Sequence, residues 1–256
     1  MIPYIDWHSI SLGPLEIQVW GLFVAAGILC GLFVSIWFGK QKGIDKDTII
    51  DMAFWIIVAA LIGARVFYVV TEWQIFQNDL ISVFYIWEGG ASVTGGFIGA
   101  TLAAWLMIRR RELSFLPTAD ALIFGLPLGL WIGRLGCFFI YDHPGKLTDF
   151  FLGQEYIDGI VRHNNGLYLS INGAVLALAF YLLHRKKQDR PAGTYLWIFL
   201  VCYGIVRFFL DFLRAAPGDT ISIIDSRLLG LTAAQYVAVA MIVLGGYVWY
   251  ATSRKQ

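Results

Sequence analysis

The stretch VWGLFVAAGILCGLFVSIWFG, residues 19–39, contains no charged residue and one hydroxyl side chain, Ser35. The hydrocarbon core of a bilayer is about 30 Å thick, and a helix needs about 20 apolar residues to cross it. This stretch therefore predicts a membrane-spanning helix.

The composition of the whole chain agrees with this interpretation. Apolar residues make up 58% of the 256 residues, charged residues only 14%, and the net charge is +1. Soluble domains are typically about 45–50% apolar and about 25% charged. The composition argues against a soluble enzyme, a disordered protein and a nucleic-acid-binding protein, so no nucleic-acid partner is expected.

Further long apolar stretches follow the first one along the chain. They are continuous, unlike the alternating ten-residue segments of membrane-spanning strands. We therefore expect an all-α polytopic membrane protein with one membrane domain, residues 1–256, and seven transmembrane helices. The predicted spans are residues 19–39, 49–70, 92–108, 117–141, 167–183, 194–213 and 232–252.

Lysine and arginine predict the orientation of these spans. Twelve of the 19 basic residues lie in the first, third and fifth connections and the C-terminal tail, against four in the alternate segments. Cytoplasmic loops carry the basic excess. We therefore expect the N-terminus outside and the C-terminus in the cytoplasm.

Three arginines remain, and they lie inside predicted spans near the outer ends: Arg65, Arg134 and Arg207. A buried cation is costly in a bilayer, and three at one depth repel each other unless an anion lies among them. Asp211 can pair with Arg207 one turn away, and Asp142 with Arg134. An anionic ligand, such as a phosphate, suits the guanidinium groups. The alternative is snorkelling of each arginine to the headgroups.

The segment YGIVRFFLDFLR, residues 203–214, places polar groups on one helical stripe. Its members are Tyr203, Arg207, Asp211 and Arg214. The stripe is either part of a binding site or a structural polar seam between helices.

Glycine is concentrated in GGASVTGGFIGA, residues 89–100, which includes Gly95 and Gly96. Such density suits a backbone close to a ligand, or ordinary packing of small residues between helices.

The predicted outer side carries groups suited to proton transfer. Asp142 follows the buried Arg134, and His163 lies where the outer loop, residues 142–165, returns to the membrane. A carboxylate and an imidazole are common general bases. Connections of this length often act as lids or binding elements.

The cysteines do not suggest a disulfide framework, because Cys30, Cys137 and Cys202 all lie in predicted spans. Neither CxxC nor HExxH spacing occurs. We expect no metal and no cofactor.

The segment GRLGCFFIYDHPG, residues 133–145, resembles the signature of prolipoprotein diacylglyceryl transferases, which reads roughly G-R-x-G-N-F-x-N-x-E-x-x-G. The matching residues are Gly133, Arg134, Gly136, Phe138 and Gly145. Asp142 replaces the usual Glu, and Cys137 and Ile140 replace the two Asn residues of the signature.

Other blocks resemble the same family in the same order, and together they cover most of the chain. In the glycine-rich block, Thr94 stands where many members carry His or Tyr. The blocks are WGLF (20–23), GARVFY (63–68), GGASVTGG (89–96), HNNGLY (163–168), YGIVRFFLDFLR (203–214) and LGLTAAQ (229–235).

The resemblance implies a reaction at the outer leaflet of a bacterial inner membrane. Members move the diacylglyceryl group of phosphatidylglycerol onto the lipobox cysteine thiol of a prolipoprotein. A thioether forms and glycerol phosphate leaves. The implied partners are phosphatidylglycerol as lipid substrate, lipobox-containing prolipoproteins and membrane lipids.

The resemblance also implies roles for the residues above. Arg134 and Arg207 are expected to bind the phosphate, with Asp142 and His163 as candidate bases for the thiol proton. Since Thr94 replaces the family's His, the base lies elsewhere or is the phosphate itself. The expected substrate-binding and supporting residues are Arg65, Tyr203, Asp211, Arg214, Gly95, Gly96, Gly136, Gly145 and Tyr168.

Two other functions remain open from the sequence alone. A small anion channel or transporter would also place arginine inside the membrane, although the chain shows no internal repeat. A catalytically inactive lipid-binding homologue would keep the arginines after losing the chemistry.

Overall fold

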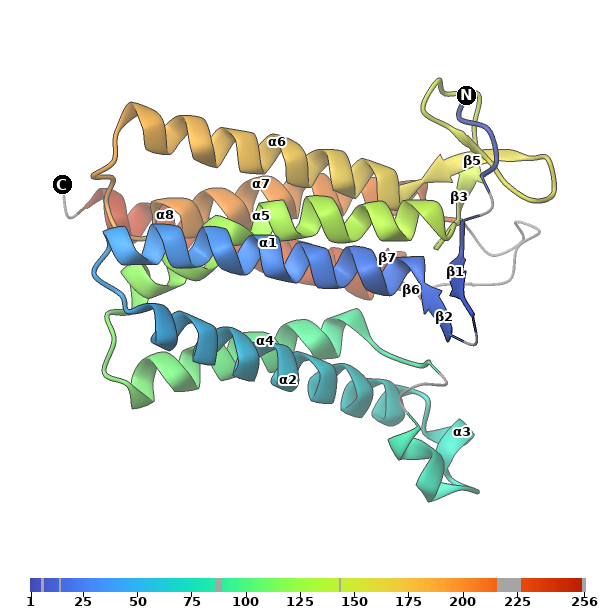
Figure 1. Ribbon diagram of the computed structural model, residues 1–256, viewed down its shortest axis with the longest axis horizontal. Helices are drawn as coiled ribbons and strands as arrows, with labels where there is room; N and C mark the ends of the chain where they lie inside the picture. The colour runs from blue at the N-terminus through green and yellow to red at the C-terminus, as the bar shows by residue number, and fades with distance from the viewer. Residues whose placement is uncertain (6, 14, 86–88, 143, 216–226, 255–256) are drawn as a thin grey trace.

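The computed structural model describes residues 1–256 except 6, 14, 86–88, 143, 216–226 and 255–256. Long helices lying side by side make up most of it (Figure 1). They are α1 (Val19–Gln41), α2 (Lys46–Thr71), α4 (Val93–Arg110), α5 (Phe115–Phe139), α6 (Asn165–Lys186), α7 (Thr194–Leu210) and α8 (Ala233–Ser253).

Each predicted span overlaps one of these helices, but the fourth and sixth predicted spans run two and three residues past the ends of α5 and α7. The chain tightens after α7 into a 3-10 turn, η3 (Asp211–Leu213). Six of the helices within the described residues are long and apolar enough to cross a membrane. The helix α4 is not one of the six, because glycines and two terminal arginines lower its hydropathy. The structure therefore shows a mostly helical protein with several candidate membrane spans.

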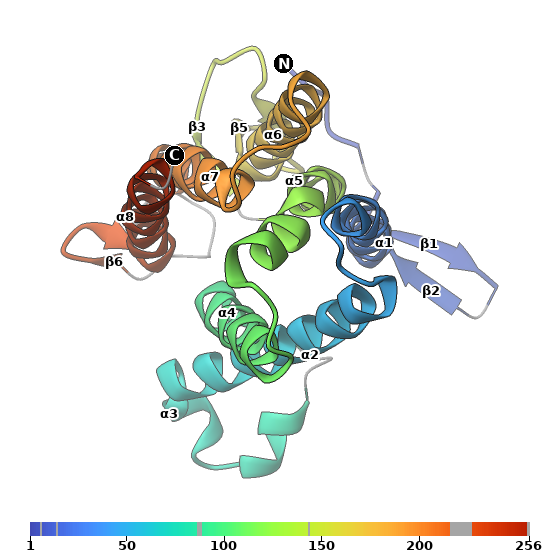
Figure 2. The same cartoon turned by 90° about the vertical axis from the view of Figure 1, so that its left-hand side faces the viewer.

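Glycines allow the closest approaches between helices. A Cβ on Gly125 of α5 would lie 2.0 Å from the carbonyl oxygen of Gly31 on α1. A Cβ on Gly95 of α4 would lie 2.2 Å from the carbonyl oxygen of Gly63 on α2. Small residues bring backbones together in this way in membrane helices, where packing replaces the hydrophobic effect. Seen along the bundle, α5 occupies a central place among α1, α4, α6 and α7 (Figure 2).

Apolar side chains occupy both the interior and the outer surface of the bundle. Aromatic rings such as Phe38, Phe124 and Phe199 are buried at its core. Large apolar side chains such as Phe33, which is 72% exposed, cover the outside. An exterior of this kind suits lipid, not water.

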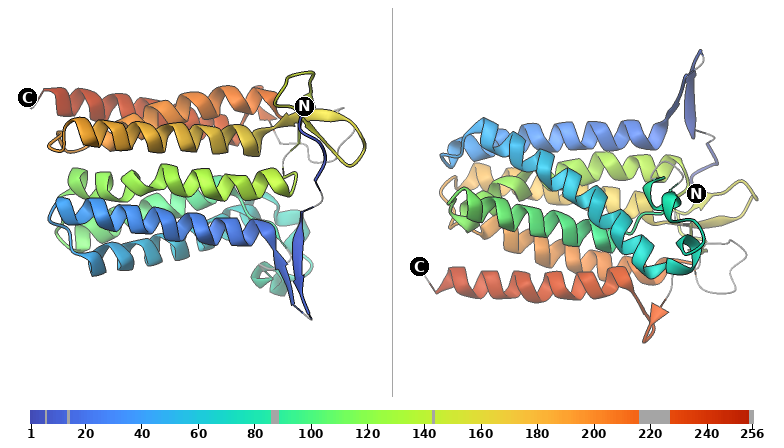
Figure 3. Two further views of the ribbon diagram at one scale, coloured as in Figure 1. Left: turned by 45° about the horizontal axis from the view of Figure 1, so that its top comes forward. Right: turned by 90° about the horizontal axis from the view of Figure 1, so that it is seen from below.

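Short strands and turns gather at one end of the bundle, which we call the strand end (Figures 1 and 3). Three of the strands form a small sheet within the predicted outer loop, in the order β3-β5-β4. The expectation of an all-α chain was incomplete here, because strands of two to four residues leave little trace in a sequence. The elements are β1 (Ser9–Leu12), β2 (Leu15–Gln18), α3 (Trp73–Phe76), η1 (Leu80–Phe84), β3 (Pro144–Leu147), β4 (Gln154–Glu155), β5 (Val161–Asn164), β6 (Arg227–Leu228) and β7 (Leu231–Thr232).

The N-terminus lies at the strand end and the C-terminus at the other end (Figures 1 and 3). The end opposite the strands carries the connections α1–α2, α4–α5 and α6–α7. Together with the helix ends that flank them, these connections hold ten of the 19 basic residues: Lys40, Lys42, Lys46, Arg109, Arg110, Arg111, Arg185, Lys186, Lys187 and Arg190.

Candidate active site

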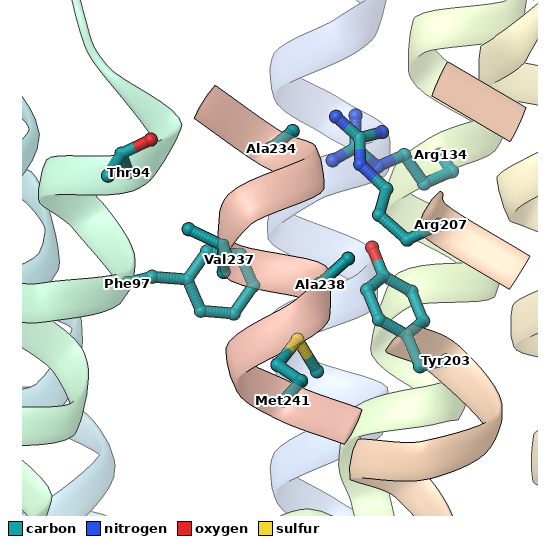
Figure 4. Close-up of a pocket in the computed structure, with 9 residues that line it drawn as sticks. All are labelled: Thr94, Phe97, Arg134, Tyr203, Arg207, Ala234, Val237, Ala238 and Met241. Atoms are coloured by element: carbon teal, nitrogen blue, oxygen red, sulfur yellow. The ribbon is translucent and has the colours of Figure 1, made fainter. Parts of the chain in front are cut away.

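A cavity lies between α4, α5, α7 and α8 and contains about 350 Å³ of empty space, including its open mouth. Arg134 of α5 and Arg207 of α7 extend their guanidinium groups toward one another, and the Tyr203 hydroxyl points toward them (Figure 4). The rest of the wall is mostly apolar: Thr94, Phe97, Ala234, Val237, Ala238 and Met241. A cationic end beside apolar walls suits an amphiphile with an anionic headgroup.

Carboxylates lie close to the arginines around this cavity. Arg207 Nη2 lies 3.3 Å from Asp211 Oδ1, which confirms the predicted pair one turn apart. Arg214 Nη1 lies 3.7 Å from the same oxygen, so two arginines share it. Asp142 interacts electrostatically with Arg134. The guanidinium groups of Arg134 and Arg207 also repel each other, which favours an anion between them.

Cys137, which stands where the family signature has Asn, lies beside Arg134. Arg134 Nη1 donates a weak hydrogen bond to Cys137 Sγ over 3.7 Å, and the thiol is buried. Ile140 is the C-cap residue of α5 and offers no polar side chain. The two amide groups of the family signature therefore have no counterpart at these positions, and Arg134 keeps donors for another acceptor.

Arg65 does not line the cavity. Its guanidinium and Nε donate to main-chain carbonyl oxygens at 2.6–3.3 Å, from Ser82, Val83, Tyr85, Gly89 and Gly90. These five residues lie in the described parts of the chain between α3 and α4, and their carbonyl groups satisfy the donors of Arg65. The expectation of three arginines in one pocket was therefore wrong for Arg65, which organises a loop.

The predicted glycines lie in packing contacts. Gly95 faces Gly63 and Phe67 of α2, and a Cβ on Gly136 would lie 2.9 Å from Phe23 Cβ on α1. A Cβ on Gly96 would meet its neighbours only at ordinary contact distance, 3.5 Å or more. Gly145 in β3 leaves no room for a side chain, because a Cβ there would lie 2.6 Å from the His163 carbonyl oxygen.

The candidate base His163 lies on β5, outside the lining of the cavity. Its Nδ1 is hydrogen-bonded to the Tyr168 hydroxyl over 2.8 Å. Partial burial lowers the pKa of His163 below its ordinary value, and the nearby Lys146 lowers it further. Among the described residues, no group of three or more His, Cys, Asp or Glu side chains comes together.

The pKa of His163 is testable by titration. We expect an NMR midpoint below about 6.5 for the imidazole, and an upward shift in Lys146→Gln. The folded protein then binds fewer protons at His163 than the unfolded chain, so stability falls as the pH drops through about 6.5. His163→Gln should flatten that part of the dependence of Tm on pH. A His163 midpoint at or above about 6.5 that does not change in Lys146→Gln would contradict the partly buried position of His163 beside Lys146.

Sequence reasoning missed the α8 wall of the cavity. Ala234, Val237, Ala238 and Met241 follow the spacing of one helical face, i, i+3, i+4 and i+7. That periodicity could have indicated a shared helical face, but apolar side chains in an apolar span cannot be distinguished by sequence from those that face lipid.

A sequence model described as prolipoprotein diacylglyceryl transferase matches residues 8–251. The chain belongs to this family. A phosphatidylglycerol–prolipoprotein diacylglyceryl transferase of Halalkalibacterium halodurans is 33% identical over 261 residues, which cover 98% of this chain and 87% of the relative. The Bacillus mycoides protein of the same name is 32% identical over 258 residues, covering 95% and 90%.

The two arginines that meet at the cavity lie in segments that resemble motifs of the diacylglyceryl transferase family. Of the departures noted in the sequence, Thr94 of the glycine-rich block lines the cavity, and Cys137 of the signature accepts a hydrogen bond from Arg134. Two of the departures therefore lie at the site, whereas Ile140 and Asp142 do not line the cavity.

Proposed function

We propose that this protein transfers the diacylglyceryl group of phosphatidylglycerol to the lipobox cysteine of a prolipoprotein, the first step of lipoprotein maturation. The observation that carries the proposal is the arginine pair Arg134–Arg207, held over an apolar-walled cavity in a member of this family. The guanidinium groups bind the lipid phosphate, and the apolar side chains of α8 and Phe97 contact the acyl chains of the lipid.

The bond changes follow from the two substrates. The thiol sulfur attacks the glycerol carbon that bears the phosphate ester, so a carbon–sulfur bond forms as the carbon–oxygen bond to phosphate breaks. The departing oxygen takes the electron pair and glycerol phosphate leaves. Arg134 and Arg207 stabilise the charge that develops there, as donors placed in advance do in other enzymes. Neither candidate base, His163 or Asp142, lines the cavity, and we propose the departing phosphate as the acceptor of the thiol proton.

The proposal includes seven crossings, with the N-terminus outside and the C-terminus in the cytoplasm of a bacterial inner membrane. Support comes from the termini, which lie at opposite ends of the bundle as an odd number of crossings requires. The basic connections at the end opposite the strands support a cytoplasmic location for that end. The cavity arginines lie toward the ends of α5 and α7 nearer the strands, so the site would face the outer leaflet.

Reconstitution tests this proposal against the two alternatives. The purified protein is placed in vesicles that contain phosphatidylglycerol and is given a lipobox peptide. We expect a peptide whose mass has increased by one diacylglyceryl group. A peptide with Ser in place of the lipobox Cys, and vesicles of phosphatidylcholine alone, serve as controls and should give no product. A Cys peptide that remains unmodified would contradict the proposal. In that case, anion flux in the same vesicles would indicate a channel. Lipid binding without transfer or flux would indicate an inactive homologue.

A further inference from the structure

The hydroxyl of Thr232 is hydrogen-bonded to the carboxylate of Asp211. Thr232 is the N-cap residue of α8, and Asp211 begins the turn that follows α7. Thr232 Oγ1 donates to Asp211 Oδ2, and the two residues are 3% and 1% exposed. Because both groups are buried, loss of this hydrogen bond would leave a polar group without a partner away from water, which destabilises the folded protein.

This hydrogen bond leaves the other carboxylate oxygen for the arginines. Asp211 Oδ1 lies 3.3 Å from Arg207 Nη2 and 3.7 Å from Arg214 Nη1. With Oδ2 held by Thr232, rotation of the carboxylate is restricted and Oδ1 stays directed toward Arg207. The Thr232 hydroxyl, which does not line the cavity, is thus linked through Asp211 to the Arg207 guanidinium.

Thr232 also belongs to the end of α8 that forms the cavity wall. Its side chain accepts from the backbone N–H of Gln235, and the Gln235 side chain accepts from the Thr232 N–H. Gln235 Nε2 in turn donates to the Phe208 carbonyl oxygen on α7 over 3.1 Å. The start of α8, with Ala234 and Val237 in the wall, is thus fastened to α7 beside Arg207.

We propose that Thr232 is a positioning residue for diacylglyceryl transfer, acting through Asp211 to aim Arg207 at the lipid phosphate. This inference rests on the proposed function. A small displacement of a binding group is enough to slow catalysis strongly, so the hydroxyl should matter although it does not touch the substrate.

The first test compares three variants in the vesicle assay. Thr232→Val keeps the side-chain size and removes the hydroxyl; we expect kcat to fall roughly 10- to 100-fold. Thr232→Ser keeps the hydroxyl and should stay within about twofold of wild type on the same argument. Gln235→Leu weakens the start of α8 without touching Asp211, and it should lower Tm at least as much as Thr232→Val with a smaller loss of kcat. A kcat that follows Tm alone across the three variants would show a purely structural role and overturn the proposal.

The second test asks whether Thr232 acts through Asp211. If it does, adding Thr232→Val to Asp211→Asn should cost little further activity, because the two groups form one unit. If the fold-losses of activity in Thr232→Val and Asp211→Asn multiply in the double variant, the two residues act independently and the proposal is overturned. Wild type without transfer activity would instead overturn the proposed function. The Tm increase caused by phosphatidylglycerol would then show whether Thr232→Val weakens lipid binding relative to Thr232→Ser; equal increases would also overturn the role of Thr232.

Discussion

Arg134→Ala and Arg207→Ala should each reduce diacylglyceryl transfer by about 100- to 1,000-fold, the usual effect of losing a donor that stabilises developing charge. The guanidinium groups of Arg134 and Arg207 meet at the cavity. Each alanine variant therefore leaves the phosphate with one of these two cationic partners. The measurement is the initial rate of product formation in phosphatidylglycerol vesicles, with folding checked by Tm.

Lysine variants and a distant arginine provide the controls. Arg134→Lys and Arg207→Lys keep the charge but lose the paired donors of the guanidinium, so intermediate rates are expected. Arg185→Ala removes a cation near the end of α6, opposite the strands, and should leave the rate unchanged. Wild-type rates in both alanine variants would exclude the arginine pair as the phosphate site.

Gly95→Ala should strongly destabilise the protein, whereas Gly96→Ala should be tolerated. The new Cβ at Gly95 would lie 2.2 Å from the Gly63 carbonyl oxygen and 2.3 Å from Phe67 Cβ, so α2 and α4 must separate. The neighbouring position meets nothing closer than 3.5 Å. Overpacking of this kind costs about 1–3 kcal/mol. The same shift displaces Thr94 and Phe97 from the cavity wall, so activity should fall as well.

Thermal unfolding of the two glycine variants in the same detergent provides the comparison. Equal Tm values for Gly95→Ala and Gly96→Ala would contradict the close contact between α2 and α4. A Gly95→Ala protein that keeps wild-type Tm but loses activity would favour the ligand contact suggested by the glycine-rich sequence.

The sequence predicted the long helices well because their signal is local. Residues 19–39 are apolar throughout, and α1 begins at Val19 as expected. Helix starts are also local, since Ser92 caps α4 and Thr232 caps α8 with their own side chains. The pairing of Arg207 with Asp211 was accessible for the same reason, because both lie on one turn of chain.

Features that depend on distant contacts were not accessible. Arg65 looked like a member of the cationic site, but its donors are satisfied by the carbonyl groups of Ser82, Val83, Tyr85, Gly89 and Gly90. No sequence rule predicts that these groups converge on one side chain. Gly95 could equally have faced a ligand or a helix, and only the position of Gly63 decides between them. Met241 joined the cavity because α8 packs beside α7, which its own sequence does not reveal.

The most direct test of the central claim is to quantify both products of one reaction. Purified protein in phosphatidylglycerol vesicles is incubated with a lipobox peptide, and diacylglyceryl peptide and free glycerol phosphate are measured together. Transfer through the Arg134–Arg207 site predicts equal amounts of the two with wild type, and neither above background with the double alanine variant. Glycerol phosphate released without modified peptide, or equal yields from the variant, would contradict it.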